Sequence, residues 1–221
     1  ALNHSLYLNG NSLWGTLPTE LGRMKRLKSI LWVQSNNIYG TLPTELGSLD
    51  VLEDNLGLDG NQFSGTIPTQ VGDLWRFRSR LSLASNQLTG SIPSQLGRLT
   101  LLTRSLDLSN NELTRQIPTE LGQLSTMRSR LFLQDNALSP QKQYDLNGTE
   151  LPAVPSQLGQ LTAFSAYLYL YNNYLCGKLP NAVQSMNSSI VGFNIRTGNN
   201  IGEDCFTPTA LPTPLPSAQP T

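Results

Sequence analysis

The chain is poor in the residues on which most catalytic sites depend. Its 221 residues include one histidine, His4, and two cysteines, Cys176 and Cys205. Because His4 stands near the start of the chain, we do not expect a Ser-His-Asp or Cys-His triad in a cleft. Neither a zinc-ligand spacing nor a phosphate-binding loop occurs. We therefore predict a protein that is not an enzyme, with no catalytic residues, metal or cofactor.

An excess of charge of one sign is lacking too, since 15 Lys and Arg balance 15 Asp and Glu. A chain without net charge has no overall attraction to nucleic acid or to an anionic membrane. Apolar runs are short, and none approaches the roughly 20 residues that span a bilayer. The start at Ala1 carries no signal peptide, so we expect a mature or partial chain. We expect neither nucleic-acid binding nor membrane insertion of this segment.

What the chain does contain is a repeat of 25 residues. A seventh unit, at Asn173, is displaced by an insertion at 139–150, and a degenerate eighth unit follows around Phe193. Internal repetition with a period of this size is typical of solenoids. The marker of the six regular units is an asparagine after a Leu/Val-x-Leu/Val-x-x pattern, at Asn11, Asn36, Asn61, Asn86, Asn111 and Asn136.

The pattern of one unit predicts its local structure. The Leu-x-Leu segment is typical of a short strand with its leucines inward. The asparagine follows at a bend, where its amide can satisfy open backbone groups and form a ladder with stacked copies. A Gly, an extended Ile/Leu-Pro segment and a short Thr-Glu-Leu-Gly helical turn complete the unit. Only stacked neighbours can bury its apolar face, and eight strands at about 4.8 Å would give a sheet roughly 40 Å long.

These units resemble the plant-type leucine-rich repeat, in which Leu-x-Leu-x-x-Asn-x-Leu-x-Gly-x-Ile-Pro recurs. Residues 81–93 follow that pattern closely, and the Gly-Thr-Leu-Pro-Thr-Glu-Leu-Gly segments at 15–22 and 40–47 resemble repeat proteins of diatoms and related algae. The resemblance covers about residues 5–205. It implies an α/β repeat solenoid, a right-handed superhelix with a parallel β-sheet on its concave face and short helical or 3-10 turns on its convex side.

The period of 25 residues is longer than that of most such plant repeats, which is about 24 residues. The additional residue lies just before each strand, as in Arg78-Ser79-Arg80-Leu81. We therefore expect the corner before each strand to be one residue longer, as in a small bulge. The family's curvature and twist are not carried over to this chain.

The chain is expected to form one solenoid at 1–205, with its C-terminal cap at 174–205, and a Pro/Thr/Ser-rich stalk or linker at 206–221. Cys176 and Cys205 both fall in the cap and fit a terminal disulfide in an oxidising compartment, with two unpaired buried thiols as the alternative. The N-terminal cysteine-rich cap that is usual in the family is absent from the sequence.

Three N-glycosylation sequons begin at Asn3, Asn147 and Asn187. Chance matches are common in a chain rich in Asn, Ser and Thr, but Asn147 falls in the insertion, where a glycan has room. Together with the cysteine pair, the sequons favour a secreted glycoprotein, extracellular or at the cell surface.

The strand residues that face outward, four and two before each asparagine, are the candidate ligand contacts. Large aromatic side chains that face water often mark binding sites, although stacked aromatics can also merely stabilise neighbouring strands. Paired carboxylates can hydrolyse glycosides, but a solvated face is their more common role. The predicted ligand-binding residues are Tyr7, Trp32, Asp59, Asp107, Phe132, Tyr169 and Tyr171.

Two further rows have competing interpretations. Basic residues before the strands form either a flank for an anionic polysaccharide or an acidic partner, or a solvated face with scattered ion pairs. A row of hydroxyls, Thr16, Thr41, Thr66 and Ser91, suits ice binding, but it breaks at Gln116 and such turns are ordinary. The basic residues are Arg23, Lys25, Arg26, Lys28, Arg76, Arg78, Arg80, Arg98, Arg104, Arg128 and Arg130.

Two functions remain open at this point. The first is a non-enzymatic extracellular module that binds a protein, peptide or polysaccharide through its concave face, and we place it ahead. The second is a structural or adhesive repeat protein of a cell surface, wall or extracellular filament, in which near-identical units serve self-assembly.

Overall fold

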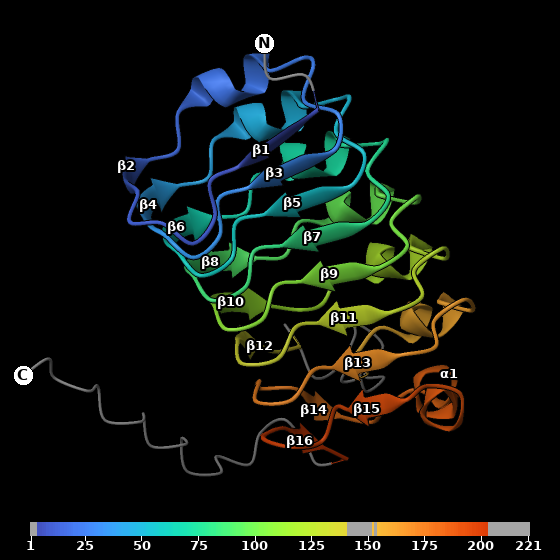
Figure 1. The fold of residues 1–221 in the computed structure, drawn as a ribbon. Coiled ribbons are helices and arrows are strands. Elements are labelled where there is room, and N and C mark those ends of the chain that lie inside the picture. Colours follow the sequence, from blue (N-terminus) through green and yellow to red (C-terminus); the bar gives the residue numbers. More distant parts are fainter. Residues whose placement is uncertain (1–3, 141–151, 153, 203–221) are drawn as a thin grey trace, which may run out of the picture.

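The computed structural model describes residues 4–140, 152 and 154–202. Each repeat makes one three-sided coil, with a strand on the concave side, a second strand on a flank and a 3-10 helix on the third side. The coils stack in chain order from the N-terminal to the C-terminal end (Figure 1). The predicted solenoid is therefore confirmed.

The concave side is a parallel sheet of eight strands whose order follows the chain. The middle residue of each strand pairs with the middle residue of the next, as Leu56 does with Leu81. The strands are β1 (Ser5–Tyr7), β3 (Ile30–Trp32), β5 (Asn55–Gly57), β7 (Arg80–Ser82), β9 (Ser105–Asp107), β11 (Arg130–Phe132), β13 (Tyr167–Tyr169) and β15 (Gly192–Asn194).

The flank holds a second parallel sheet of six strands, which the sequence analysis did not predict. The pattern there indicated only an extended segment before the proline. Stacking brings the extended segments of neighbouring coils within hydrogen-bonding distance, so they pair because their backbone groups need partners. The strands are β2 (Trp14–Thr16), β4 (Asn37–Thr41), β6 (Gln62–Thr66), β8 (Gln87–Ser91), β10 (Glu112–Arg115) and β12 (Ala137–Leu138).

The third side consists of six short 3-10 helices, each preceded by a proline. A glycine within each helix allows neighbouring coils to approach: a Cβ atom on Gly97 would lie 2.3 Å from the carbonyl oxygen of Glu120. The predicted helical turn is thus confirmed. The helices are η1 (Thr19–Arg23), η2 (Thr44–Ser48), η3 (Thr69–Asp73), η4 (Ser94–Arg98), η5 (Thr119–Gln123) and η6 (Ser156–Gln160).

The core is a stack of inward leucines and other apolar residues that runs the length of the solenoid. The middle leucines of the concave strands are fully buried, among them Leu31, Leu56, Leu106 and Leu131. Full burial of such a side chain contributes about 1.5–3 kcal/mol. Since each coil contributes only a thin layer, its leucines are buried by the coils on either side.

The predicted asparagine ladder joins the two sheets. The Asn61 amide nitrogen donates to the carbonyl oxygens of Val33 and Leu58, at 3.0 and 3.2 Å, and its Oδ1 accepts from the Ile38 N–H at 3.1 Å. Val33 and Leu58 follow concave strands, whereas Ile38 belongs to β4 of the flank. Each internal asparagine therefore supplies hydrogen bonds to buried backbone groups of two successive coils.

The C-terminal coils change shape but keep the ladder. Asn199 accepts from the Leu175 N–H at 3.0 Å and donates to the Leu170 carbonyl at 2.8 Å. Cys176 is buried, while Cys205, the insertion beyond residue 140 and the tail fall outside the described residues, so the disulfide and the domain limits stay predictions. This end comprises β14 (Cys176–Gly177), α1 (Asn181–Gln184), η7 (Ser185–Ser188) and β16 (Asn200–Ile201).

Candidate ligand-binding face

The concave sheet turns three rows of side chains outward, because alternate residues of a strand face the same side. The first row, at the start of the strands, is Ser5, Ile30, Asn55, Arg80, Ser105, Arg130, Tyr167 and Gly192. The second row is Tyr7, Trp32, Gly57, Ser82, Asp107, Phe132, Tyr169 and Asn194. The third row, just past the strands, is Asn9, Gln34, Asp59, Ala84, Ser109, Gln134 and Tyr171.

An aromatic pair occupies the N-terminal end of this face. Tyr7 and Trp32 meet edge to face, with ring centroids 5.3 Å apart. Tyr7 is 56% exposed. The indole of Trp32 extends over β5, where a Cβ on Gly57 would lie 3.1 Å from its Cδ1 atom. The absence of a side chain at Gly57 thus leaves the space that Trp32 fills.

A larger aromatic cluster occupies the C-terminal end. Phe132 and Tyr169 stack with their rings nearly parallel and 5.0 Å apart, and Tyr169 also contacts Tyr167 and Tyr171, each at 5.8 Å. Burial raises the pKa of the Tyr171 phenol above its ordinary value, and the charges of Asp135 and Tyr169 raise it further. Tyr167 was missed because the sequence analysis considered only the second and third rows.

Between the two clusters lies a hollow of about 650 Å³ bordered by arginines. Its lining includes Arg80, Arg104 and Arg130, with Trp32 at one end and Tyr167 at the other. Arg80 and Arg130 begin β7 and β11, so they stand on the concave sheet and not only beside it. The sequence analysis assigned all these arginines to a flank because it did not follow the strands back to their first residue.

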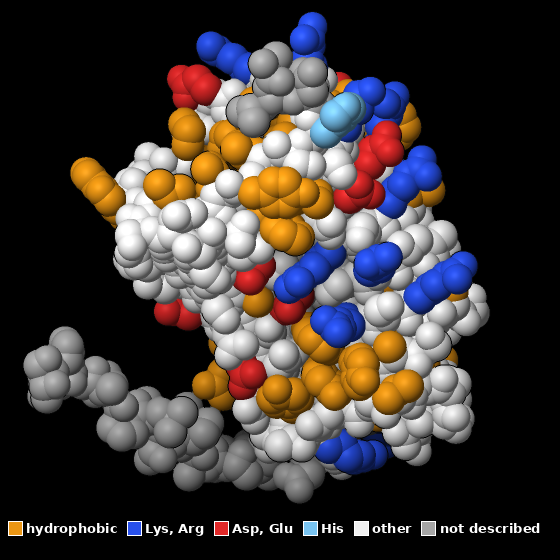
Figure 2. Space-filling model, in the orientation of Figure 1, with side chains coloured by type: hydrophobic (Ala, Val, Ile, Leu, Met, Phe, Trp, Pro, Cys, Tyr) orange, Lys and Arg blue, Asp and Glu red, His pale blue; other side chains and the backbone are white. Residues whose placement is uncertain are grey.

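The acidic side chains of the face lie toward the other end of the strands. Asp107 closes β9, and its Oδ1 accepts from the hydroxyl and the N–H of Ser109, at 2.6 and 3.2 Å. Asp59 follows β5 in the third row, and Asp135 accepts from the Asn172 amide at 2.8 Å. Figure 2 shows the result: hydrophobic side chains above and below, and between them Lys and Arg on one side with Asp and Glu on the other.

Polar atoms without partners also gather on this face. Within the described residues, the buried side-chain atoms that lack a hydrogen bond are Gln34 Oε1, Ser82 Oγ and Gln134 Oε1. All three side chains belong to the second and third rows. Since buried polar groups in proteins are nearly always hydrogen-bonded, this concentration distinguishes the concave sheet from the rest of the described surface.

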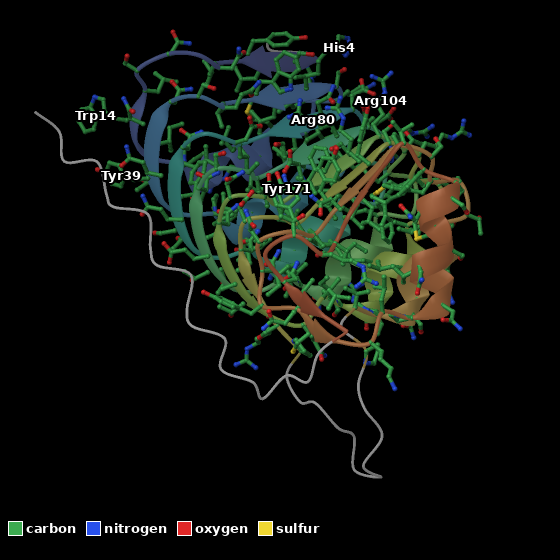
Figure 3. The ribbon with its side chains drawn as sticks, turned by 90° about the horizontal axis from the view of Figure 1, so that it is seen from below. His4, Trp14, Tyr39, Arg80, Arg104 and Tyr171 are labelled. Atoms are coloured by element: carbon green, nitrogen blue, oxygen red, sulfur yellow. The ribbon has the colours of Figure 1, made fainter. Side chains whose placement is uncertain are left out.

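The flank sheet and the ends offer fewer features. Trp14 is 81% exposed and, with Tyr39, points outward on the side away from Arg80 and Arg104 (Figure 3). Among the described residues no group of acids, histidines and cysteines has the form of a metal site, and no helix is long and apolar enough to cross a membrane. Asn187 is exposed on η7, while Asn3 and Asn147 fall outside the described residues.

The chain is similar to known repeat proteins. The Leucine Rich Repeat family model matches residues 4–24, 79–99, 103–124 and 166–186. The chain belongs to the leucine-rich-repeat proteins, and its structural neighbours are of the plant type. No curated protein matches it.

Three solved plant ectodomains illustrate the likeness. The GASSHO1/SCHENGEN3 ectodomain of Arabidopsis thaliana, solved in complex with CASPARIAN STRIP INTEGRITY FACTOR 2, is 36% identical with a TM-score of 0.78 over 89% of this chain and 21% of its own. The Arabidopsis receptor kinase HAESA, in complex with the peptide hormone IDA and the co-receptor SERK1, is 29% identical with a TM-score of 0.70 over 89% of this chain and 34% of its own. The SOBIR1 ectodomain of Arabidopsis thaliana is 30% identical, with a TM-score of 0.52 over 62% and 72%.

The present chain therefore spans about a fifth to a third of the first two neighbours, GASSHO1/SCHENGEN3 at 21% and HAESA at 34%. The likeness establishes the fold of the repeat array. What those receptors bind is a property of the longer proteins.

Proposed function

We propose that this chain is an extracellular recognition module that binds a peptide or an extended segment of a protein across its concave sheet. One observation carries the proposal: two aromatic clusters bracket a charged hollow on a single continuous sheet. Trp, Tyr and Arg are the residue types that most often carry the binding energy of protein interfaces. The unpartnered polar atoms of the same face add to this support.

The neighbours favour the same function. GASSHO1/SCHENGEN3 and HAESA were solved in complex with CASPARIAN STRIP INTEGRITY FACTOR 2 and the peptide hormone IDA. The repeats of this chain have the same backbone fold, and they differ most in the side chains that they place on the concave sheet. No convergent set of acid, base and nucleophile accompanies it among the described residues, so binding without catalysis is the simplest use of the face.

The test is selection of peptides from a displayed library on the folded chain, followed by affinity measurement with two variants. We expect Trp32→Ala and Tyr169→Ala each to weaken binding by about 2 kcal/mol, roughly 30-fold, because both remove large anchors. Trp14→Ala is the matched control, since it deletes an exposed aromatic on the flank and should change nothing.

The free energy of unfolding of the same variants is measured as well. It distinguishes aromatic residues that bind a ligand from aromatic residues that only stabilise neighbouring strands. A Tyr169→Ala variant that loses stability but binds every selected peptide as before would sink the proposal. Polysaccharide binding and self-assembly are the alternative functions. Sedimentation of the chain at high concentration, and binding of polysaccharides that Trp32→Ala leaves intact, would favour them over peptide recognition.

We further propose that the chain passes through the secretory pathway. Asn187 is exposed and starts a sequon, and Cys176 is placed in the C-terminal cap, where a bridge to Cys205 would close the last coil. Mass spectrometry of the protein secreted from eukaryotic cells should show a glycan that Asn187→Gln removes and a disulfide that links the two cysteines. An unmodified, fully reduced secreted chain would contradict this assignment.

A further inference from the structure

The concave face carries arginines around its hollow and aspartates further along the same strands. Arg80 and Arg130 stand in the first row, and Arg104 directly precedes β9, the strand between theirs. Asp107 and Asp59 stand in the second and third rows. The arginines thus stand at or just before the starts of β7, β9 and β11, whereas Asp107 ends β9 and Asp59 follows the end of β5.

The arginines have no acidic partner of their own. The ion pairs found among the described residues are Lys25 with Asp50 and Arg98 with Asp73, both away from the hollow. Arg80, Arg104 and Arg130 lie at or just before the starts of β7, β9 and β11, which are adjacent strands about 4.8 Å apart. Like charges at such spacing repel one another, so an anionic group from outside would be stabilised by all three guanidinium groups.

Two carboxylates near the ends of the strands have hydrogen-bond donors of their own. The hydrogen bonds from Ser109 to Asp107 draw that carboxylate toward the third row, two residues further along the strand. The Asn172 amide holds the Asp135 carboxylate in the same way. Among the described residues no ion pair joins Asp107 or Asp59 to the arginines, so both charges are available to a ligand that lies between them.

The aromatic clusters set the length of that ligand. Trp32 is on β3 and Phe132 on β11, four strand steps apart, which is about 19 Å. An extended peptide advances about 3.3 Å per residue, so it spans this distance in about six residues. Such a peptide would run across the strands, and its successive side chains would point alternately to the arginine side and to the aspartate side.

We propose that the concave face selects an extended peptide with two apolar residues about six positions apart and alternating acidic and basic residues between them. The acidic side chains meet Arg80, Arg104 and Arg130, and the basic ones meet Asp107 and Asp59. This inference rests on the proposed peptide-binding function and specifies its ligand class. A blockwise arrangement of the same charges cannot satisfy both sides at once.

The experiment compares two synthetic peptides of equal composition by fluorescence anisotropy. The alternating probe is Leu-Glu-Lys-Glu-Lys-Glu-Leu, and the block probe is Leu-Glu-Glu-Glu-Lys-Lys-Leu, both capped and labelled. We expect the alternating probe to bind at least about tenfold more tightly at low salt, and the difference to shrink as salt is added. Equal affinities for the two probes would overturn the proposal.

Variants of the chain then test whether the arginines recognise the acidic residues of the probe and the aspartates its basic residues. The double variant Arg80→Gln/Arg130→Gln should lower the affinity for the alternating probe about tenfold. It should leave the affinity for a probe with Gln in place of each Glu unchanged. Asp107→Asn, whose amide oxygen can still accept from Ser109, should weaken the alternating probe a few-fold and leave a probe with Gln in place of each Lys unaffected. Arg98→Gln, which removes an exposed arginine of η4 from its pair with Asp73, is the matched control.

The outcome also separates this inference from the function on which it rests. If library peptides depend on Trp32 and Tyr169 but not on Arg80 or Asp107, the peptide-binding function stands and the charge pattern is refuted. If no peptide depends on any of these residues, both fail. Binding of dextran sulfate that requires the arginines, with no alternating peptide bound, would replace the peptide by an anionic polysaccharide and overturn the proposal.

Discussion

The two sheets of this solenoid are built from the same repeats, yet their outer faces differ. On the flank, one row of corresponding positions carries a small hydroxyl side chain in four successive coils, at Thr16, Thr41, Thr66 and Ser91, before Gln116 interrupts it. On the concave sheet, corresponding positions carry Tyr7, Trp32, Gly57, Ser82, Asp107, Phe132 and Tyr169. That row of the flank repeats, whereas the concave row varies from coil to coil, although the leucines behind the concave strands are alike.

Packing accounts for part of the uniformity of the flank. A Cβ atom on Gly40, Gly65 or Gly90 would lie within about 3 Å of the γ-methyl group of Thr16, Thr41 or Thr66, respectively. Each threonine thus covers the glycine of the next coil, and that glycine has a positive φ that side chains disfavour. The concave rows carry no such constraint, so they are free to hold the aromatic and charged residues that a ligand requires.

The largest loss of stability is expected from a substitution in the asparagine ladder, which joins the two sheets. Asn61→Ala should lower the free energy of unfolding by about 3 kcal/mol, because it leaves the buried Ile38 N–H without a partner and removes one of the two amides that donate to the Val33 carbonyl. Urea denaturation measures it. Asn11→Ala is the control: Asn11 is exposed and bonds only to carbonyls of its own coil, so the loss should stay below about 1 kcal/mol. Equal losses would show that the ladder does not tie the sheets together.

A pair of glycines tests whether stability and binding separate between the sheets. Gly65→Ala on the flank should cost about 1–2 kcal/mol of stability and leave peptide affinity unchanged, since φ at Gly65 is 72°. Gly57→Ala on the concave sheet has no such backbone strain, but its methyl group would push against Trp32 and Gln34. It should weaken binding more than folding. If Gly65→Ala weakened peptide binding and Gly57→Ala lowered only the stability, the proposed division of roles between the two sheets would be contradicted.

The smallest effect concerns the Tyr171 phenol. Its pKa is raised in the folded chain by burial and by Asp135, so the folded state keeps that proton when the unfolded state has lost it. The stability from this group is present below the ordinary tyrosine pKa and is lost as pH rises through the raised value. Absorbance titration should show one late-ionising tyrosine that Tyr171→Phe removes. Titration of all tyrosines together at the ordinary pKa would contradict the raised value.

Much of the fold could be predicted because it depends on spacing alone. A constant distance between asparagines fixes the coil, the inward leucines and the short turn that follows Pro18 or Pro43. The flank sheet could not be predicted in the same way. Its hydrogen bonds join segments that are extended in one coil but become strands only when a neighbouring coil lies beside them.

The candidate site was predicted in part. Trp32, Phe132 and Tyr169 were identified by their position relative to the asparagines, and the structure brings them into two clusters. The arginines were recognised as a basic row but placed beside the sheet. Arg80 and Arg130 begin their strands, a boundary that local pattern defines poorly and that strand pairing settles.

The sequence by itself determines that this protein is a solenoid of leucine-rich coils, because period and apolar pattern dictate which side chains can be buried together. Only the tertiary structure decides that Arg80 and Arg130 share the concave face with Asp107 and the aromatic residues. Residues 25 positions apart become neighbours by stacking, and strand pairing sets Arg80 opposite Ser105 and Ser82 opposite Asp107, which places the arginine and the aspartate in different rows of the same face.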